Sequence, residues 1–305
     1  MAMDGILNIN KPTGITSFGV VAIVKRLCGE KRVGHAGTLD PAATGVLPVC
    51  IGQGTRVIEF LMDTTKAYRA EIELGVSTDT YDAEGKVTAQ GDASSVTRAQ
   101  LDVALASFYG EIQQVPPMYS ALKHEGRPLY DLAREGAEVE LKSRAVTIHK
   151  LELIDFQPCS VTIEVVCSKG TYIRSIAHDL GRMLGCGAHL KSLIRTRCGI
   201  FDIKDSVSVP RLEEAFKAGT WQQLLYPIDS VLGDLPSVVV SDEKTRDIKN
   251  GKPLVLENTP GEKLERRRAY TTDGRFIGVL RFSPEEQTWH PEKVFLGSGP
   301  VLKQV

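Results

Sequence analysis

The spacing of apolar residues along the chain predicts a mixture of strands and helices. Apolar and polar residues alternate in half-buried strands, whereas apolar residues recur every three or four positions in amphipathic helices. The predicted strands are 5–10, 46–51, 68–74, 146–156 and 160–168, and the predicted helices are 18–28, 56–62, 97–108, 129–134, 172–184 and 213–218. The segment 34–45 is too rich in glycine and proline for either, and we expect a loop with unusual backbone angles.

Two segments interrupt this pattern and suggest how the chain is organised. Residues 116–144 begin with two prolines and carry mixed charge, which predicts an insertion or an arm. Residues 227–236 form the expected domain boundary, because the short predicted strands 238–240, 274–282 and 293–296 that follow are typical of a small β-rich module. A length of 305 residues also favours two domains, since one domain usually has roughly 100–200 residues.

Composition argues against several classes of protein. Hydrophobic residues at 42% and charged residues at 25% are typical of a globular chain. The longest apolar runs are far shorter than the roughly 20 residues that span a bilayer, and the first residues lack the features of a signal peptide, so we expect a cytoplasmic protein without a membrane partner. The six cysteines include no C-x-x-C pair, which argues against a zinc ribbon and a disulfide scaffold.

Charge leaves a nucleic-acid partner open. The 37 basic and 38 acidic residues give a net charge of -1, so the overall charge does not indicate phosphate binding. Basic residues nevertheless outnumber acidic ones by seven to two over 167–204 and by five to two over 4–35. These segments either gather on one face to meet phosphates or form ordinary solvated surface that nearby acids balance.

Motifs of common enzymes are missing, and one loop carries the candidate chemistry. The sequence has no H-E-x-x-H, no G-x-x-x-x-G-K-[ST] and no G-x-S-x-G, and Gly52-Gln-Gly-Thr only begins a dinucleotide fingerprint. In the run 34–47, Pro41 keeps Asp40 extended among glycines that let a ligand approach the backbone. A carboxylate held in this way suits covalent or electrostatic work at a sugar carbon, although an isolated Asp-Pro is usually only a turn.

The whole run from Gly34 to Leu47 resembles a known signature. It reads G-H-A-G-T-L-D-P-A-A-T-G-V-L and is similar to the G-H-x-G-x-L-D-P-x-A-x-G-x-L of the TruB-type tRNA pseudouridine synthases. Further matches to this family follow in the expected order at 10–17, 66–69, 75–82, 116–123, 167–175 and 187–196. Together they extend from residue 5 to about residue 200. One departure is Arg56, where the family often has lysine.

The resemblance implies both a fold and an activity. The fold would be α+β, with a mixed-sheet catalytic domain at 1–231, an RNA-contacting arm at about 119–144, and a small β-rich PUA-like RNA-binding domain at 235–305. The activity would be conversion of uridine 55 in the T-stem loop of tRNA to pseudouridine by a monomer, without a metal or a small-molecule cofactor. By the same resemblance Lys263, Arg266, Arg267 and Arg268 would contact tRNA, and removal of the second domain would leave turnover largely intact.

The resemblance also assigns roles to individual residues. Asp40 would be the catalytic carboxylate, either as a nucleophile at the sugar or as an aid to loss of a ribose proton. Tyr68 would stack on uracil and take the C5 proton, unless it is a core tyrosine. Arg174 would pair with Asp40 and keep it ionised, unless it is a phosphate contact. His35 would occupy the space left by the flipped nucleotide, and Leu193 would pack on the flipped base.

The remaining expected substrate-binding residues are Tyr172, Asp82, Lys11, Arg56 and Lys123. Lys11, Arg56 and Lys123 are candidate contacts to the RNA backbone. Two other functions stay open at this point. One is a guide-RNA-directed synthase within a larger particle, and the other is a tRNA-folding chaperone with secondary catalytic activity.

Overall fold

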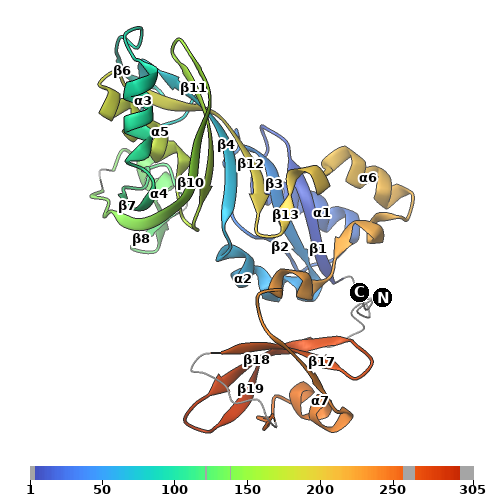
Figure 1. Ribbon diagram of the computed structural model, residues 1–305. Coiled ribbons are helices and arrows are strands. Elements are labelled where there is room, and N and C mark those ends of the chain that lie inside the picture. The colour runs from blue at the N-terminus through green and yellow to red at the C-terminus, as the bar shows by residue number, and fades with distance from the viewer. Residues whose placement is uncertain (1–3, 121, 138, 257–264, 296–305) are drawn as a thin grey trace.

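The computed structural model describes residues 4–120, 122–137, 139–256 and 265–295. Figure 1 shows a long curved sheet with helices near both of its ends, and below it a small second sheet formed by the C-terminal part of the chain. The fold is α+β with a small β-rich C-terminal unit, as expected from the sequence.

The large sheet runs in the order β14-β1-β3-β12-β4-β11-β10-β7. Its strands are β1 (Gly5–Lys11), β3 (Thr44–Ile51), β4 (Lys66–Leu74), β7 (Gly110–Gln114), β10 (Arg144–Gln157), β11 (Ser160–Cys167), β12 (Ala188–Cys198) and β14 (Val207–Ser208), and β2 (Val33–His35), β13 (Phe201–Asp202) and β15 (Leu225–Tyr226) pair beside it. Neighbours are antiparallel except β3 with β12 and β1 with β14, which are parallel. The sheet is therefore mixed, and the parallel joint of β3 with β12 connects its two halves.

A glycine makes this joint possible. Gly45 on β3 pairs with Arg195 on β12, and Arg195 in turn pairs with Tyr68 on β4. Gly45 has a φ of 100°, and a Cβ atom there would lie 2.3 Å from the carbonyl oxygen of Arg195. No other residue fits so close to the neighbouring backbone. The joint brings the loop that carries Asp40 next to the strand that carries Tyr68.

Helices cover each half of the large sheet. The helices are α1 (Ser17–Cys28), α2 (Ile58–Met62), α3 (Arg98–Ala106), α4 (Leu129–Arg134), α5 (Ile173–Leu184), α6 (Val209–Lys217) and α7 (Asp242–Lys249). Apolar residues of α1 and α6 pack against β1 and β3, and those of α3 and α5 pack against β4, β11 and β12. No helix within the described ranges is long and apolar enough to cross a membrane.

Short elements complete the first unit. They are the hairpins β5 (Val76–Thr78) with β6 (Val87–Gln90) and β8 (Lys123–His124) with β9 (Arg127–Pro128), and the 3-10 turns Gly52–Val57, Ile203–Asp205, Trp221–Leu224 and Ile228–Leu232. The β8–β9 hairpin and α4 form the arm that the sequence predicted between 116 and 144.

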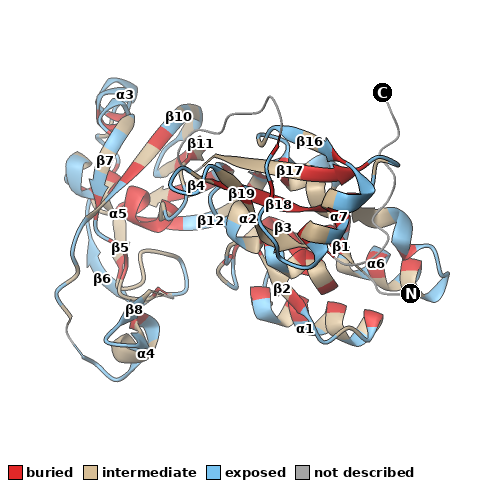
Figure 2. Ribbon diagram, turned by 90° about the horizontal axis from the view of Figure 1, so that it is seen from below, coloured by how far each residue is buried: buried red, intermediate tan, exposed pale blue. Residues whose placement is uncertain are grey.

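The C-terminal unit is a four-stranded sheet that shares a core with the first unit. Its strands are β16 (Ser237–Val240), β17 (Arg266–Thr271), β18 (Phe276–Ser283) and β19 (Thr288–Val294). Figure 2 shows buried residues along the central strands of this sheet as well as along those of the large one. Tyr270, Phe276 and Phe295 pack in one apolar cluster with Ile6 and Leu61 of the first unit. The C-terminal unit therefore packs against the first one through a shared apolar cluster, and the expectation that its removal leaves turnover largely intact stays a prediction.

Most predicted elements are present, and the differences have local causes. Helix α4 has the predicted bounds, and α1 begins where Thr16 Oγ1 accepts a hydrogen bond of 2.9 Å from the backbone of Gly19. The predicted loop 34–45 is shorter, because β2 ends at His35 and β3 begins at Thr44. The predicted helix 56–62 starts as a 3-10 turn, and the predicted strand 293–296 is β19, which begins earlier, at Thr288.

Several elements were not predicted from the sequence, and β12, β17 and α7 are the longest of them. Strand β12 has register shifts near Leu190 and Arg195, and these interrupt its alternation. Strand β17 begins with three arginines, which hide its strand character, and α7 has few apolar residues.

Candidate active site

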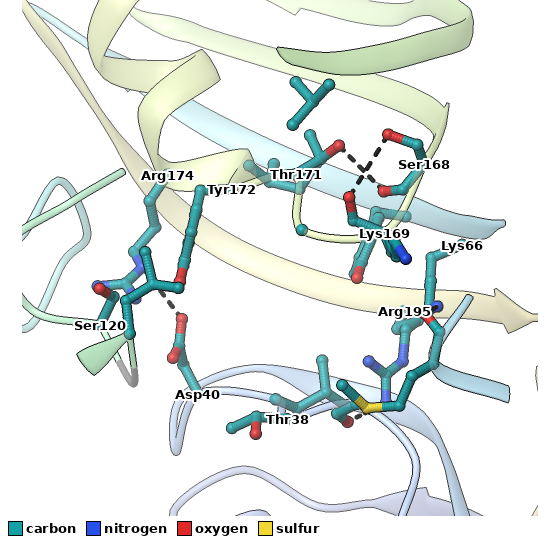
Figure 3. A pocket seen from close by; sticks show the side chains of 18 of the residues that line it. Thr38, Asp40, Lys66, Ser120, Ser168, Lys169, Thr171, Tyr172, Arg174 and Arg195 are labelled. Carbon is teal, nitrogen blue, oxygen red and sulfur yellow. Dashed lines mark hydrogen bonds and ion pairs between the residues drawn. The ribbon is translucent and has the colours of Figure 1, made fainter. Parts of the chain in front are cut away.

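A cavity of about 640 Å³ lies at the joint between the two halves of the large sheet. Its walls come from the loop before β3, from β4 and β12, from the start of the arm and from the segment that leads into α5. Figure 3 shows Asp40 and Arg174 on one side, and Lys66 and Arg195 on the other. The predicted residues that line the cavity are Asp40, Tyr68, Tyr172, Arg174 and Leu193. Folding thus brings together five predicted residues from four separate segments.

Hydrogen bonds fix the backbone at Asp40 and at the proline that follows it. The carbonyl of Pro41 accepts from the backbone of Gly14 at 2.9 Å and from Nζ of Lys11 at 3.1 Å. The backbone N–H of Ala43 donates to the carbonyl of Asp40 at 3.1 Å. Although its sequence predicts irregular structure, the loop presents the carboxylate at a defined place in the cavity wall.

Arg174 sits behind Asp40 and has partners on several sides. Its side chain is only 6% exposed, and its Nε lies 3.0 Å from Oδ2 of Asp40 in an ion pair. Its Nη1 lies 3.5 Å from Oδ2 of Asp82, which is itself largely buried. Its Nη1 and Nη2 also donate to the backbone carbonyls of Thr80 at 3.3 Å and Tyr119 at 2.9 Å. One guanidinium therefore links the loop that carries Asp40, the loop before Asp82 and the start of the arm.

Burial and charge act in opposite directions on Asp40. Burial raises the pKa of the Asp40 carboxyl above its usual value, and the charge of Asp82 raises it further. The charges of Arg174 and Lys11 lower this pKa, but they do not outweigh burial. Arg174 therefore favours the ionised form of Asp40, within surroundings that make that form less stable than in water.

Three further side chains shape the cavity. Burial raises the pKa of Tyr68 to about 12, although the charge and hydrogen bond of Arg195 lower it, so Tyr68 is a neutral phenol at pH 7. Tyr172 precedes α5, and its backbone exchanges hydrogen bonds of 2.7 and 3.0 Å with the side chain of Gln114. The guanidinium of Arg144 lies 4.8 Å from the centre of the Tyr172 ring. Together with Leu193 these rings give the cavity flat and apolar surfaces between its charged groups.

Three predicted residues lie near the cavity without lining it. Asp82 acts on the cavity through Arg174. His35 ends β2 and is partly buried, and burial lowers its pKa, which favours the neutral imidazole. Lys123 is exposed on the hairpin of the arm. His35 and Lys123 therefore remain candidates for RNA contacts around the cavity.

Lys11 does not fit the predicted contact to the RNA backbone, and exposed Arg56 has partners in the C-terminal unit. Lys11 is fully buried, and its Nζ donates to the carbonyls of Pro12, Ile15 and Pro41. Burial lowers its pKa to about 8. The guanidinium of Arg56 bonds the carbonyl of Val294 and lies over the ring of the adjacent phenylalanine in the C-terminal unit. Lys11 supports the Asp40 loop instead, and Arg56 joins the two units.

Arg195 and Lys66 line the cavity but were not assigned from the sequence. Arg195 is 1% exposed, and its Nε and Nη2 donate to the carbonyls of Val46 at 2.6 Å and Gly37 at 3.1 Å. Lys66 donates to three carbonyls at the end of α2. Each lies in a motif that pointed to its neighbour, Leu193 or Tyr68, and the basic excess over 167–204 was the signal that could have indicated Arg195.

The described cavity residues offer carboxylates, cations and hydroxyls. Within the described part of the chain, no group of three or more His, Cys, Asp or Glu side chains is placed to hold a metal ion. Burial raises the pKa of Cys50 to about 12 and that of Cys167 to about 11, so both thiols are protonated at neutral pH.

The arginine cluster of the C-terminal unit has internal partners. Arg266 donates to both carboxylate oxygens of Glu292 at 2.7 Å. Arg267 pairs with Glu265 at 2.7 Å, and Arg268 donates to the carbonyl of Leu235 at 2.9 Å. Lys263, the fourth member, lies outside the described residues. The described members therefore serve the fold, and the predicted contact surface for tRNA is not a set of free cations.

Comparisons with known proteins all find similarity to pseudouridine synthases. Residues 25–173 match the family model of the TruB family pseudouridylate synthase N-terminal domain, and residues 174–233 match that of the tRNA pseudouridylate synthase B C-terminal domain. The chain is 48% identical over 299 residues to tRNA pseudouridine synthase B of Dehalococcoides mccartyi, covering 98% of each chain. It is 50% identical over 252 residues to the protein of the same name from Symbiobacterium thermophilum, covering 82% of each.

A solved structure resembles the whole chain as well. It is that of an H/ACA RNP bound to a substrate RNA containing 2'-deoxyuridine, at 25% identity and a TM-score of 0.73. The match covers 96% of this chain and 85% of the other.

Proposed function

The chain belongs to the TruB family of pseudouridylate synthases, and from this premise we propose that it isomerises uridine 55 in the T-stem loop of tRNA to pseudouridine. The observation that carries the proposal is the ion pair of Asp40 with buried Arg174 in the wall of a cavity of about 640 Å³. An enzyme that acts on a base must take the nucleotide out of its stack into such a pocket.

The reaction needs no reagent beyond the uridine itself. The bond between ribose C1′ and uracil N1 breaks, the base turns, C1′ joins C5, and the C5 proton is finally lost while N1 gains one. We propose that the ionised Asp40 acts at the sugar, either by adding to C1′ or by assisting removal of the C2′ proton to give a glycal. Both routes require a fixed carboxylate that faces the ribose. The Asp40 side chain is 41% exposed and is therefore accessible from the cavity.

Arg174 would keep Asp40 ionised and oriented. Its planar guanidinium contacts two carboxylates and two carbonyls at once, which a lysine ammonium cannot do with the same geometry. Asp82 shares the charge of Arg174, so Asp40 is not neutralised by a tight exclusive pair. The arrangement supports a carboxylate that is anionic and still reactive.

Tyr68 and Leu193 would hold the detached base. A base freed from the sugar must stay in the cavity while it turns, and an aromatic ring and an aliphatic side chain provide surfaces without fixed hydrogen bonds. With a pKa of about 12, Tyr68 can accept the C5 proton only if its phenolate is stabilised, and Arg195 is the cation placed to do so.

The RNA would lie across the cavity mouth between the arm and the sheet. The arm presents Lys123, Arg127, Tyr130 and Arg134, and its first residues line the cavity. Recognition would depend on the shape of the folded loop, because single-stranded RNA loops can splay out bases. His35 would occupy the space left by uridine 55, and the C-terminal unit would act as a PUA-like domain.

A tritium-release assay tests this function. Unmodified tRNA carrying [5-³H]uridine is incubated with the purified chain alone, and release of tritium is followed together with mapping of pseudouridine. We expect stoichiometric release at position 55. Matched controls are tRNA with cytidine at position 55 and the Asp40→Asn protein, neither of which should react.

The same assay separates the alternatives. The absence of release without an added guide RNA would overturn the stand-alone activity and favour a guide-directed synthase. Binding and refolding of tRNA without release would favour a chaperone. The relatives named tRNA pseudouridine synthase B, at 48% and 50% identity, favour the stand-alone enzyme.

A further inference from the structure

Ser120 is a buried residue of the cavity wall whose hydroxyl has no partner. It is 4% exposed and lines the cavity, and its Oγ makes no hydrogen bond with any residue that the structure describes. Figure 3 shows Ser120 on the same side of the cavity as Arg174 and Asp40. A buried hydroxyl without a partner is unfavourable, and in native proteins such groups are few.

The fold positions Ser120 without using its hydroxyl. Its backbone N–H donates to the carbonyl of Met118 at 2.9 Å, and its own carbonyl accepts from the backbone of Tyr130 at 3.1 Å. The neighbouring carbonyl of Tyr119 accepts from Arg174 at 2.9 Å. These bonds hold the start of the arm against Arg174, so Ser120 would keep its place without the oxygen atom.

Other hydroxyls in the cavity wall do serve the fold. Ser168 Oγ accepts a hydrogen bond of 2.9 Å from the backbone of Thr147, and Thr171 Oγ1 donates to the carbonyl of Ser168 at 3.0 Å. Both hold the segment before α5 in place. Ser120 differs from them because its hydroxyl, which has no partner among the described residues, is free to form a hydrogen bond with a ligand that enters the cavity.

We propose that Ser120 Oγ hydrogen-bonds the target uridine and is a specificity-determining residue of this site. The inference rests on the proposed function, because it takes the ligand of the cavity to be a nucleoside. A hydroxyl both donates and accepts, and uridine offers ribose hydroxyls, two carbonyl oxygens and an imide N–H. Since Ser120 lies on the wall of Asp40, it meets the nucleoside where its ribose must approach the carboxylate.

The two states of the protein predict opposite effects of removing the hydroxyl. In Ser120→Ala the unpartnered oxygen is gone from the free protein, so we expect the Tm to be unchanged or raised. In the complex one hydrogen bond is lost, so kcat/KM on unmodified tRNA should fall about 10-fold to 100-fold, where a factor of 10 corresponds to about 1.4 kcal/mol. A merely structural serine would lower both quantities. Ser120→Cys, which keeps the size of the side chain, should show the same loss of kcat/KM.

Thr245 provides a matched control. It lies on α7 in the C-terminal unit, is 7% exposed, and its Oγ1 also has no partner within the described residues. It does not line the cavity. Thr245→Val removes a hydroxyl of the same kind, and we expect its Tm to behave like that of Ser120→Ala while kcat/KM stays at the wild-type value.

Two results would overturn the inference. One is a wild-type kcat/KM in Ser120→Ala, and the other is a fall of Tm and activity together in both Ser120 variants. Either outcome leaves the proposed function intact provided that the wild-type chain forms pseudouridine. A wild-type chain that forms none would instead remove the proposed function, on which this inference rests.

Discussion

Arg174 in the cavity and Arg266 in the C-terminal unit each pair with a carboxylate, yet the pKa values of the two carboxylates shift in opposite directions. Burial outweighs Arg174 and raises the pKa of Asp40, whereas the hydrogen bonds of Arg266 outweigh burial and lower the pKa of Glu292. Two aligned bonds of 2.7 Å join Arg266 to Glu292, while Asp40 has one ion-pair contact with a guanidinium that it shares with Asp82.

The difference separates a carboxylate whose charge stabilises the fold from one whose charge is held ionised at a cost to stability, as the proposed function requires. A carboxyl whose folded pKa is lowered contributes stability that is present above its unfolded pKa and is lost as the pH falls. A carboxyl whose folded pKa is raised lowers the free energy of unfolding when it is ionised, so its charge costs the protein stability. Glu292 belongs to the first kind and Asp40 to the second, as expected of a reactive group.

The largest expected effect comes from removing the charge of Asp40. Asp40→Asn should lower turnover at least about 1,000-fold in the tritium-release assay, because in the proposed mechanism the carboxylate acts in the chemical step. The dissociation constant for tRNA should stay within several-fold, because most affinity comes from contacts to the RNA backbone. Retained turnover would remove Asp40 from the mechanism.

Weakening the core between the two units should lower stability strongly and turnover little. Phe276→Ala opens the cluster that Phe276 shares with Tyr270, Phe295 and residues of the first unit. The free energy of unfolding should fall by about 3–5 kcal/mol. At a temperature where the variant is folded, kcat at saturating tRNA should remain within about twofold. Unfolding in denaturant measures the first quantity, and two separate transitions would show that the units do not share a core.

Replacing Arg174 by lysine tests the shared guanidinium. Arg174→Lys keeps the charge but cannot contact Asp40, Asp82 and the carbonyl of Tyr119 together, so kcat should fall about 100-fold, which corresponds to about 2.7 kcal/mol. KM should change much less. Normal turnover with weakened binding to tRNA would make Arg174 a phosphate ligand.

The pH dependence of the activity tests the raised pKa of Asp40. Asp40 must be ionised to act, and its pKa is raised, so activity should be lost as the pH falls through a value above that of an ordinary aspartate. The charge of Asp82 contributes to this rise. In Asp82→Asn the acid limb of kcat against pH should therefore move to lower pH. An unmoved limb would show that another group controls it.

The smallest effect is expected at Arg266. Arg266→Gln should lower the free energy of unfolding by about 1 kcal/mol or less, because the pair is partly exposed. The slope of log affinity for tRNA against log salt concentration should not change, because Arg266 already bonds Glu292. A slope reduced by about one would show that Arg266 contacts a phosphate, as its sequence suggested.

Local signals accounted for much of the fold. The exact bounds of α4 and the cap of α1 at Thr16 follow from neighbouring residues, and so does most of the alternation in β4, β10 and β11. Strand β12 was missed because its bulges and its buried Arg195 break the alternation by which strands are recognised. Its pairing with β3 and β4 supplies what its own sequence lacks.

By itself, the sequence determined the chemistry available to this protein: a carboxylate before proline, glycines around it, and a tyrosine and an arginine in motifs of one family. Only the tertiary structure decided which cations serve the site. Lys11 and Arg56 are occupied by the fold, while Arg195 and the hydroxyl of Ser120 line the cavity. The reason is physical. The burial and the hydrogen-bond partners of a side chain depend on residues far apart in the chain, so they cannot be predicted from the spacing of neighbouring residues.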